Sequence, residues 1–291
     1  FVGNKLYGDN DLQDQFKLTT PGFWTWLTKR DQYSKPQLQA DLEALRSFYL
    51  NQGYLEFAIE STQVSISQDK KDVYITVNLV EGPRYTVDKI ELLGDFIVSK
   101  KELEALINIK NGDVFSREAL TRCTKKISDR LGNDGYAFAS VNAVPDADRN
   151  SGKVSFKLFV DPGRRVYVRK INITGNTDTR DDVIRREMRQ MEASWYSTEQ
   201  LSRSRQRIDM LGFFSEVQIN TPPVPGTPDQ VDVEIKVAER ATGSLSAGVG
   251  YSSTDRAMLS LSVAQQNVFG TGNALSIGVN TGKVNKTVAL H

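Results

Sequence analysis

The sequence predicts an α+β fold in which a small strand–helix–helix–strand–strand module is repeated three times and is followed by strands of an antiparallel sheet. Two observations support this fold class. A glycine that follows an apolar pair and precedes a polar turn recurs at Gly3, Gly94 and Gly175. From Gly243 onward the helical patterns stop, charged residues become rare, and apolar residues alternate with small or polar ones.

Each module contains a second, longer helical pattern with recognisable start and stop signals. The starts are serines that precede a proline or an early glutamate, at Ser34, Ser116 and Ser197, and serine is a favoured helix N-cap. Each pattern ends in a glycine followed by an aromatic residue, at positions 53–54, 135–136 and 212–213. We expect Gly53 and Gly135 to adopt the left-handed conformation that closes a helix.

Two alternating strand patterns separated by a polar turn follow each helix pair. The paired segments are residues 61–67 and 73–80, 139–144 and 153–160, and 216–221 and 231–237. The predicted boundaries are residues 1–83, 84–163 and 164–241 for the modules, and 242–291 for the C-terminal strands. The first module has extra residues between its helices, around Trp24 and Trp26. This insertion is interpreted either as a surface loop or as a partner-docking loop.

Three C-terminal strands are predicted from apolar positions that alternate with small or polar ones. These positions are Leu245, Ala247, Val249 and Tyr251, then Leu259, Leu261 and Val263, then Leu275, Ile277 and Val279. The pattern is typical of a transmembrane β-barrel, and a soluble antiparallel sheet has it too. Because a soluble sheet would have to be finished before the final "NKTVALH", we expect the opening strands of a barrel in a chain that continues. Phe1 and Val2 likewise look like the end of a strand that begins earlier.

The composition excludes several classes of function. A net charge of +1 with 25% charged residues gives no field that would attract nucleic acid. Cys123 is the only cysteine, so an internal disulfide is excluded and a buried side chain is expected. The only histidine is the last residue, and the sequence contains no phosphate-binding loop and no nucleophile elbow. We therefore predict no enzyme activity, metal or cofactor, and no apolar run is long enough for a transmembrane helix.

Several motifs resemble those of POTRA (polypeptide-transport-associated) modules. They are the three glycine turns, "LRSFYLNQGY" (45–54), "STQVSIS" (61–67), "YVRKINITGN" (167–176), "RREMRQME" (185–192), "PGTPDQVDV" (225–233) and "NVFGTGN" (267–273). The "RREMRQME" and "FGTG" runs resemble the bacterial outer-membrane β-barrel assembly factors in particular. The resemblance implies the last three of five POTRA modules, followed by the opening strands of the barrel.

The resemblance also implies a function and a location. The modules would lie in the periplasm and bind outer-membrane assembly lipoproteins and unfolded outer-membrane protein clients, and the barrel strands would contact outer-membrane lipid. Nucleic acid is not an expected partner. The alternatives are a TamA-like translocation factor, a two-partner-secretion pore, or a periplasmic scaffold that ends in a soluble sheet.

One candidate binding site follows from the predicted sheet order. If the first strand of a module pairs with the third, the second strand lies at an exposed edge. In the first module this edge contains neither charge nor proline, which are the usual devices against edge pairing; it consists of Ser61, Thr62, Gln63, Val64, Ser65, Ile66 and Ser67. We predict that it accepts an extended strand from a partner or client by β-augmentation. The resemblance adds that this module docks a lipoprotein.

A second candidate site lies in the first helical pattern of the third module. Arg185, Arg189 and Glu192 are predicted to face solvent, while a buried stripe is expected from Val183, Ile184, Met188 and Met191. A solvated basic face is the simpler interpretation, because exposed ion pairs contribute only about 0–1 kcal/mol. The resemblance implies contact with an essential lipoprotein, at Arg185 and Glu192 in particular.

The third candidate site is the first barrel strand, which we predict to pair weakly. It consists of Gly243, Ser244, Leu245, Ser246, Ala247, Gly248, Val249, Gly250 and Tyr251. Glycine inside a strand weakens it through lost entropy and lost contacts. The resemblance implies a lateral gate at this strand, and the alternative is that glycine only relieves crowding or permits curvature where the barrel closes.

Overall fold

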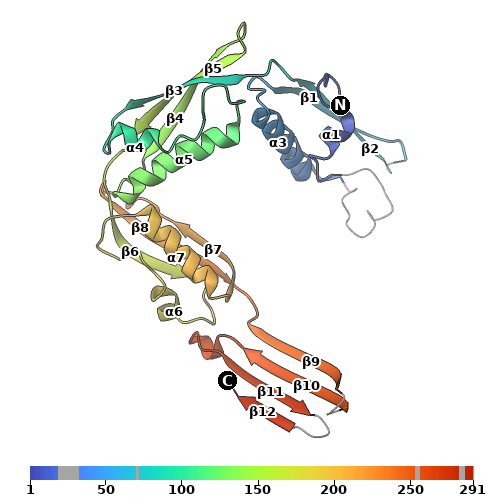
Figure 1. Cartoon of the computed structure of the whole chain (residues 1–291), viewed down its shortest axis with the longest axis vertical. Helices are drawn as coiled ribbons and strands as arrows, with labels where there is room; N and C mark the ends of the chain where they lie inside the picture. Colours follow the sequence, from blue (N-terminus) through green and yellow to red (C-terminus); the bar gives the residue numbers. More distant parts are fainter. Residues whose placement is uncertain (19–32, 70–71, 253–255, 282–285, 291) are drawn as a thin grey trace. The chain divides into compact units, whose positions relative to one another are not determined.

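The computed structural model describes residues 1–18, 33–69, 72–252, 256–281 and 286–290 (Figure 1). Contacts divide the chain into two compact units. One unit consists of Phe1–Ser128 and Ser140–Asp161 and contains the first module and most of the second. The other consists of Asp129–Ala139 and Pro162–His291 and contains the third module and the C-terminal sheet.

The first module packs helix α3 (Lys35–Asn51) on a hairpin of β1 (Ala58–Ile66) and β2 (Val73–Val80). A short helix, α1 (Asp9–Gln13), follows the first glycine turn. Val2 forms an isolated parallel bridge to Asn78 of β2 in place of a longer first strand. The insertion around Trp24 and Trp26 lies outside the described residues.

The second and third modules share one topology. The second contains β3 (Thr86–Gly94), α4 (Lys100–Glu104), α5 (Arg117–Asn133), β4 (Ser140–Asp148) and β5 (Lys153–Asp161). The third contains β6 (Tyr167–Thr174), α6 (Asp181–Arg185), α7 (Thr198–Met210), β7 (Phe214–Asn220) and β8 (Gln230–Glu239). The sheet orders are β3-β5-β4 and β6-β8-β7. The first strand therefore pairs with the third, in parallel, and the second lies at an edge, as expected.

The C-terminal segment forms one antiparallel sheet in the order β12-β11-β10-β9. Its strands are β9 (Gly243–Ser252), β10 (Arg256–Gln265), β11 (Leu275–Thr281) and β12 (Lys286–Leu290), with a short 3₁₀ turn, η1 (Val268–Gly270), between β10 and β11. The expectation of three strands was wrong by one. β12 has only five residues, which are too few to establish an alternating pattern in the sequence.

In each module the glycine turn that follows the first strand packs against the backbone of the last strand. The turn glycines have φ between +88° and +105°, a region that other residues rarely adopt. A Cβ on Gly175 would lie 2.0 Å from the backbone oxygen of Val237, and the equivalent distances for Gly3 and Gly94 are 2.1 and 2.2 Å. Conformation and contact therefore both require glycine, which explains why the motif is repeated.

A carboxylate from the last strand holds this turn in the third module. Glu239 accepts hydrogen bonds from the backbone amides of Thr177, Asp178 and Thr179 at 2.7–3.1 Å, and from the Thr177 hydroxyl at 2.7 Å. Burial would raise the pKa of Glu239, but the hydrogen bonds outweigh it and lower the pKa to about 2. The carboxylate therefore stays ionised near neutral pH and holds the turn closed.

Glu81 plays the same part in the first module. It accepts hydrogen bonds from the backbone amides of Lys5 and Leu6 at 3.1 and 3.3 Å, and from the Tyr49 hydroxyl at 2.9 Å. Sequence reasoning missed both glutamates, because a charged residue at the end of a strand gives no signal that its carboxylate is used inside the fold.

Two of the three predicted serine caps form. Ser197 Oγ accepts a hydrogen bond from the Gln200 amide, and Ser116 Oγ accepts one from the Ala119 amide, each at 3.3 Å. Ser34 occupies the N-cap position of α3 but makes no side-chain cap bond, so that prediction was wrong. Proline at position 36 removes one of the amides that a cap could bind. The expected left-handed conformations occur, with φ of +100° at Gly53 and +101° at Gly135.

Two further differences from expectation concern where elements end. β4 continues through Pro145 to Asp148 where a turn was predicted, because proline is tolerated in an edge strand. Met191 was expected to be buried but its side chain is 63% exposed, since α6 ends at Arg185 and helical spacing does not extend to it. Val183, Ile184 and Met188 are buried as predicted, and so is Cys123.

Candidate functional site

The edge strand of the first module offers backbone groups that the sheet does not use. Across the hairpin turn the Ser67 amide donates to the backbone oxygen of Asp72 at 2.9 Å. Antiparallel pairs alternate between hydrogen-bonded and non-hydrogen-bonded positions, and from Ser61 to Ile66 the register with β2 is unbroken. The amides of Thr62, Val64 and Ile66 therefore point away from β2, toward the edge of β1 where no described strand pairs; this side is called the free edge. Ser67, which the predicted site included, lies in the turn beyond β1.

The corresponding edge strands of the other modules contain features that block pairing or are followed by them. β4 contains Pro145 and two aspartates, and β7 is followed by Pro222 and Pro223. Proline and charge are the features that usually prevent edge pairing. β1 has one feature of this kind, a β-bulge at the charged residue Glu60, which precedes the predicted site. Side chains along the hairpin are exposed, at 39% for Val64 and 63% for Ile66.

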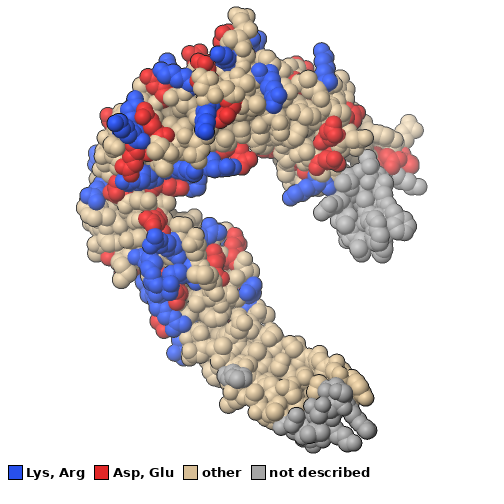
Figure 2. Space-filling view, viewed as in Figure 1, with Lys and Arg blue, Asp and Glu red and all other residues tan. Residues whose placement is uncertain are grey.

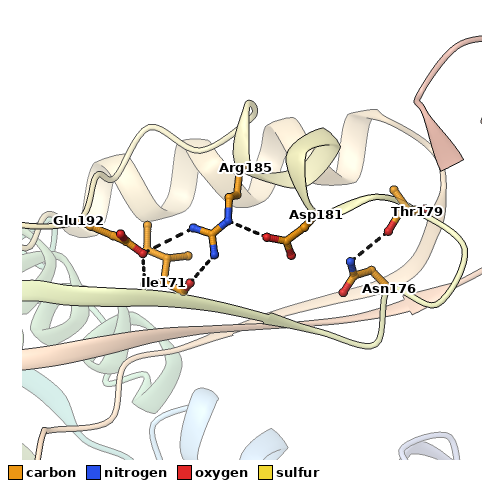
Figure 3. Close-up of polar contacts among 6 residues, drawn as sticks. All are labelled: Ile171, Asn176, Thr179, Asp181, Arg185 and Glu192. Carbon is orange, nitrogen blue, oxygen red and sulfur yellow. Dashed lines mark hydrogen bonds and ion pairs between the residues drawn. The ribbon is translucent and has the colours of Figure 1, made fainter.

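Arg185 and Glu192 meet over the backbone of Ile171 in β6 (Figure 3). The Ile171 amide donates to Glu192 Oε1 at 2.8 Å, and Arg185 Nη2 donates to the Ile171 oxygen at 2.9 Å. Arg185 Nη1 lies 3.5 Å from Glu192 Oε1, and Arg185 Nε donates to Asp181 Oδ2 at 2.7 Å. The pair therefore occupies both the backbone amide and the carbonyl oxygen that Ile171 would otherwise offer to a neighbouring strand.

The two side chains also face solvent. They are 43% and 45% exposed, so each combines an internal contact with an external charge. Arg189 is not brought to this pair: its Nη1 donates to the Met188 oxygen at 3.1 Å, and its amide donates to Ser204 Oγ at 2.8 Å. Of the three residues in the predicted site, the structure therefore brings Arg185 and Glu192 together and leaves Arg189 apart from them.

The segment after Arg189 forms a braced loop that sequence reasoning missed. Gln190 is fully buried. Its side-chain Nε2 donates to Ser194 Oγ at 2.8 Å and to the Trp195 backbone oxygen at 2.9 Å, and its Oε1 accepts from the Ser197 backbone amide at 2.9 Å. This bracing leaves Met191 63% exposed and Trp195 51% exposed. The Arg165 guanidinium lies 4.1 Å from the centroid of the Trp195 ring.

Exposed tryptophan and methionine beside charged groups are typical of protein interfaces. Figure 2 shows that Lys and Arg side chains gather over this module on the face in view. The available sequence signal was Trp195 itself, which follows the helical pattern but belongs to no predicted apolar stripe.

The C-terminal sheet presents one apolar face. Leu261 lies opposite Ala247 and Val279, and Val263 lies opposite Leu245 and Ile277, so apolar residues of neighbouring strands share a side. They are exposed, with values of 72% for Leu245, 85% for Val249 and 80% for Tyr251. The other side of β9 carries Ser244, Ser246, Gly248 and Gly250. A contiguous apolar surface of this kind marks a site of interaction.

Within the described ranges, no group of three or more His, Cys, Asp or Glu side chains is placed to hold a metal ion. None of the helices in the described part of the chain is long and apolar enough to cross a membrane.

Comparison with known proteins identifies the repeated module. A family model described as "POTRA: Surface antigen variable number repeat" matches residues 1–82, 85–163 and 166–240. The outer membrane protein assembly factor BamA of Neisseria meningitidis serogroup B is 39% identical over 97% of this chain and 36% of that protein. BamA of Buchnera aphidicola is 30% identical over 96% of this chain and 45% of that protein. The chain therefore spans less than half the length of these relatives.

Solved structures agree. The crystal structure of BamA POTRA3-5 from Haemophilus influenzae has a TM-score of 0.72 at 33% identity and covers 81% of this chain and 93% of that one. The structure of BamA from Haemophilus ducreyi lacking POTRA domains 1-3 has a TM-score of 0.62 at 35% identity and covers 71% of this chain and 39% of that one.

The contacts of Glu192 predict two distinguishable variants. Glu192→Ala removes the acceptor of the Ile171 amide, so hydrogen exchange of that amide should become about 10- to 100-fold faster, in line with the ~1.5–3 kcal/mol typical of a hydrogen bond to a charged group. Glu192→Gln keeps an acceptor oxygen and should change the rate far less. Residue-resolved exchange measured by mass spectrometry checks both, and equal rates in wild type and Glu192→Ala would show that the pair does not hold β6.

Proposed function

Because the chain belongs to the BamA family of outer-membrane protein assembly factors, we propose that it forms periplasmic modules and the opening membrane strands of such a factor. In this proposal the modules bind partner lipoproteins and unfolded β-barrel clients, and pass the clients to the barrel for folding and insertion. The open edge of β1 is the observation that carries the binding step.

β1 is suited to bind an extended polypeptide. Outward amides at alternate residues from Thr62 to Ile66 match the spacing at which an added strand offers carbonyl groups. Backbone hydrogen bonds require little of the ligand's sequence, which is what a factor that handles many clients needs. Exposed Val64 and Ile66 would contact alternate apolar side chains of such a strand.

The surface around Glu192 is suited to bind a folded partner. Arg185 and Glu192 provide two fixed charges, and the loop braced by Gln190 places Met191 and Trp195 nearby in sequence. Because this loop is already ordered, little conformational entropy is lost when a partner binds. We assign a lipoprotein partner of the assembly machinery to this surface.

The C-terminal sheet fits the start of a transmembrane barrel. Its single apolar face would contact lipid, and its opposite face of serine and glycine would line the lumen. β9 is the strand that would meet the closing strand of the barrel. Its glycines at positions 243, 248 and 250 contribute no side-chain packing. The junction between β9 and the closing strand, called the seam, should therefore open easily and expose backbone groups to a client strand.

The binding step is tested at Val64. Val64→Pro removes an amide that faces the free edge and leaves the hydrogen bonds to β2 intact, so we expect a labelled peptide with the β10 sequence "RAMLSLSVAQ" to bind at least about 10-fold more weakly. Val64→Thr keeps the amide and should bind nearly as wild type. Fluorescence anisotropy measures the affinity, and circular dichroism checks that the variants are folded.

Ser65→Pro is the contrasting variant, because the Ser65 amide belongs to the ladder with β2. It should destabilise the hairpin as well as weaken binding. Wild-type affinity in a folded Val64→Pro protein would remove β1 as the binding edge.

The seam is tested with a disulfide between Ser246→Cys and a cysteine on the closing strand of the full-length protein. Oxidation should stop the assembly of new barrels in proteoliposomes, and reduction should restore it, because only a parted seam exposes the β9 backbone. If assembly proceeds at a normal rate with the seam locked, glycine in β9 serves curvature rather than opening.

A further inference from the structure

The connection between β10 and β11 is clamped to the third module. Asn267 is buried, its Nδ2 donates to Thr179 Oγ1 at 2.7 Å, and its Oδ1 accepts from the Gly272 amide at 2.8 Å. The Arg180 amide donates to the Gly270 oxygen at 2.9 Å. The two backbones touch, since a Cβ on Gly270 would lie 1.9 Å from a backbone oxygen of the module. This connection therefore has a fixed conformation.

Phe269 lies in the middle of this clamped connection in a strained conformation. Its φ of +52° and ψ of +29° are left-handed, a region that an L-residue with a bulky side chain rarely adopts. The other positions with positive φ in this connection are Asn267, Gly270 and Gly272. Glycine and asparagine are the residues that tolerate a positive φ best, whereas position 269 carries a large aromatic ring.

The ring gains no burial in return for the strain. The Phe269 side chain is 89% exposed, more than any other large apolar residue among those described. A cleft of about 470 Å³ lies beside it, but its lining is mainly polar and includes Glu239, Arg240, Gln265 and Asn267. Neither packing nor hydrogen bonding within the described chain explains why a phenylalanine stands here.

The position of Phe269 in the sheet indicates what it contacts. β9 begins at Gly243, directly after the third module, and β10 returns to the same end at Gln265. Phe269 lies between Gln265 and Leu275, which face each other across β10 and β11, so it stands at the module end of the sheet, beyond Leu275, the last apolar residue of the exposed face there. If the apolar face contacts acyl chains, this level is where acyl chains give way to water. Aromatic side chains are enriched at this level of membrane proteins.

We propose that Phe269 is a membrane anchor that inserts into the lipid interface on the module side of the bilayer. The clamp through Asn267 and Arg180 then fixes the third module at a set height above the lipid. This inference rests on the proposed function, because it requires the C-terminal sheet to lie in a membrane.

Spin labels test the depth of the ring in lipid. In a Cys123→Ala background of the full-length protein, a nitroxide is placed at Phe269→Cys, at Val249→Cys on the apolar face, or at Met210→Cys, which is 75% exposed on α7. The protein is reconstituted in phosphatidylethanolamine and phosphatidylglycerol vesicles. Collisions with oxygen should exceed those with a water-soluble nickel complex severalfold at positions 269 and 249, and the reverse should hold at 210.

The outcomes separate the anchor from the proposed function. Water-like collisions at 269 with lipid-like collisions at 249 would overturn the anchor and leave the barrel intact. Water-like collisions at both would overturn the barrel and the anchor together. Shielding of position 269 only after a partner protein is added would also overturn the anchor, in favour of a protein contact.

Phe269→Gly distinguishes a membrane anchor from a residue that stabilises the fold, because the two roles predict opposite changes in the thermal unfolding midpoint. Glycine relieves the left-handed strain, so the thermal unfolding midpoint in detergent should stay equal or rise. Loss of the anchor should at the same time slow client assembly in proteoliposomes severalfold. A lower midpoint, or an unchanged assembly rate, would overturn the proposal.

Discussion

A backbone-to-backbone contact between the glycine turn and the last strand is the constraint on which each module depends. Because Gly175 has no Cβ, the backbone of the turn lies directly against the Val237 oxygen. A Cβ there would lie only 2.0 Å from that oxygen, which is too close for any side chain. The contact sets where the first strand ends and where the short helix begins, and Glu239 then holds the turn through its amides. The surface around Arg185 is positioned by that short helix, so its geometry also depends on the turn.

The three modules share this framework and differ in how their sheet edges are finished. Among the described residues no strand pairs with the outer amides of β1, β4 contains Pro145, and at Ile171 the edge of β6 is occupied by the Arg185 and Glu192 side chains. In the proposed function, the chemistry of the sheet edge, rather than a change of fold, separates the strand-binding module from the partner-binding one. β9 is likewise an edge strand of the C-terminal sheet, and its glycines are expected to weaken its pairing.

The order of elements could be predicted from the sequence because turn glycines, capping serines and alternating strands are local signals. Contacts between distant residues could not. Glu239 looks like any charged residue until the fold places it over the turn, and Met191 follows a helical period that the chain abandons at Arg185. The position of Val64 on an edge strand was predictable because it needs only strand order, whereas the exposure of Trp195 depends on a buried glutamine that no pattern reveals.

Comparing Gly175→Ala with Gly226→Ala tests the central constraint most directly. Both glycines have positive φ, +88° and +81°, but a Cβ at 226 would meet nothing within 4 Å, so conformational strain is common to both and the contact is not. We predict that Gly175→Ala lowers the opening free energy of β6 and β8, measured by residue-resolved hydrogen exchange, by about 1–3 kcal/mol more than Gly226→Ala does. Equal effects of the two substitutions would contradict it.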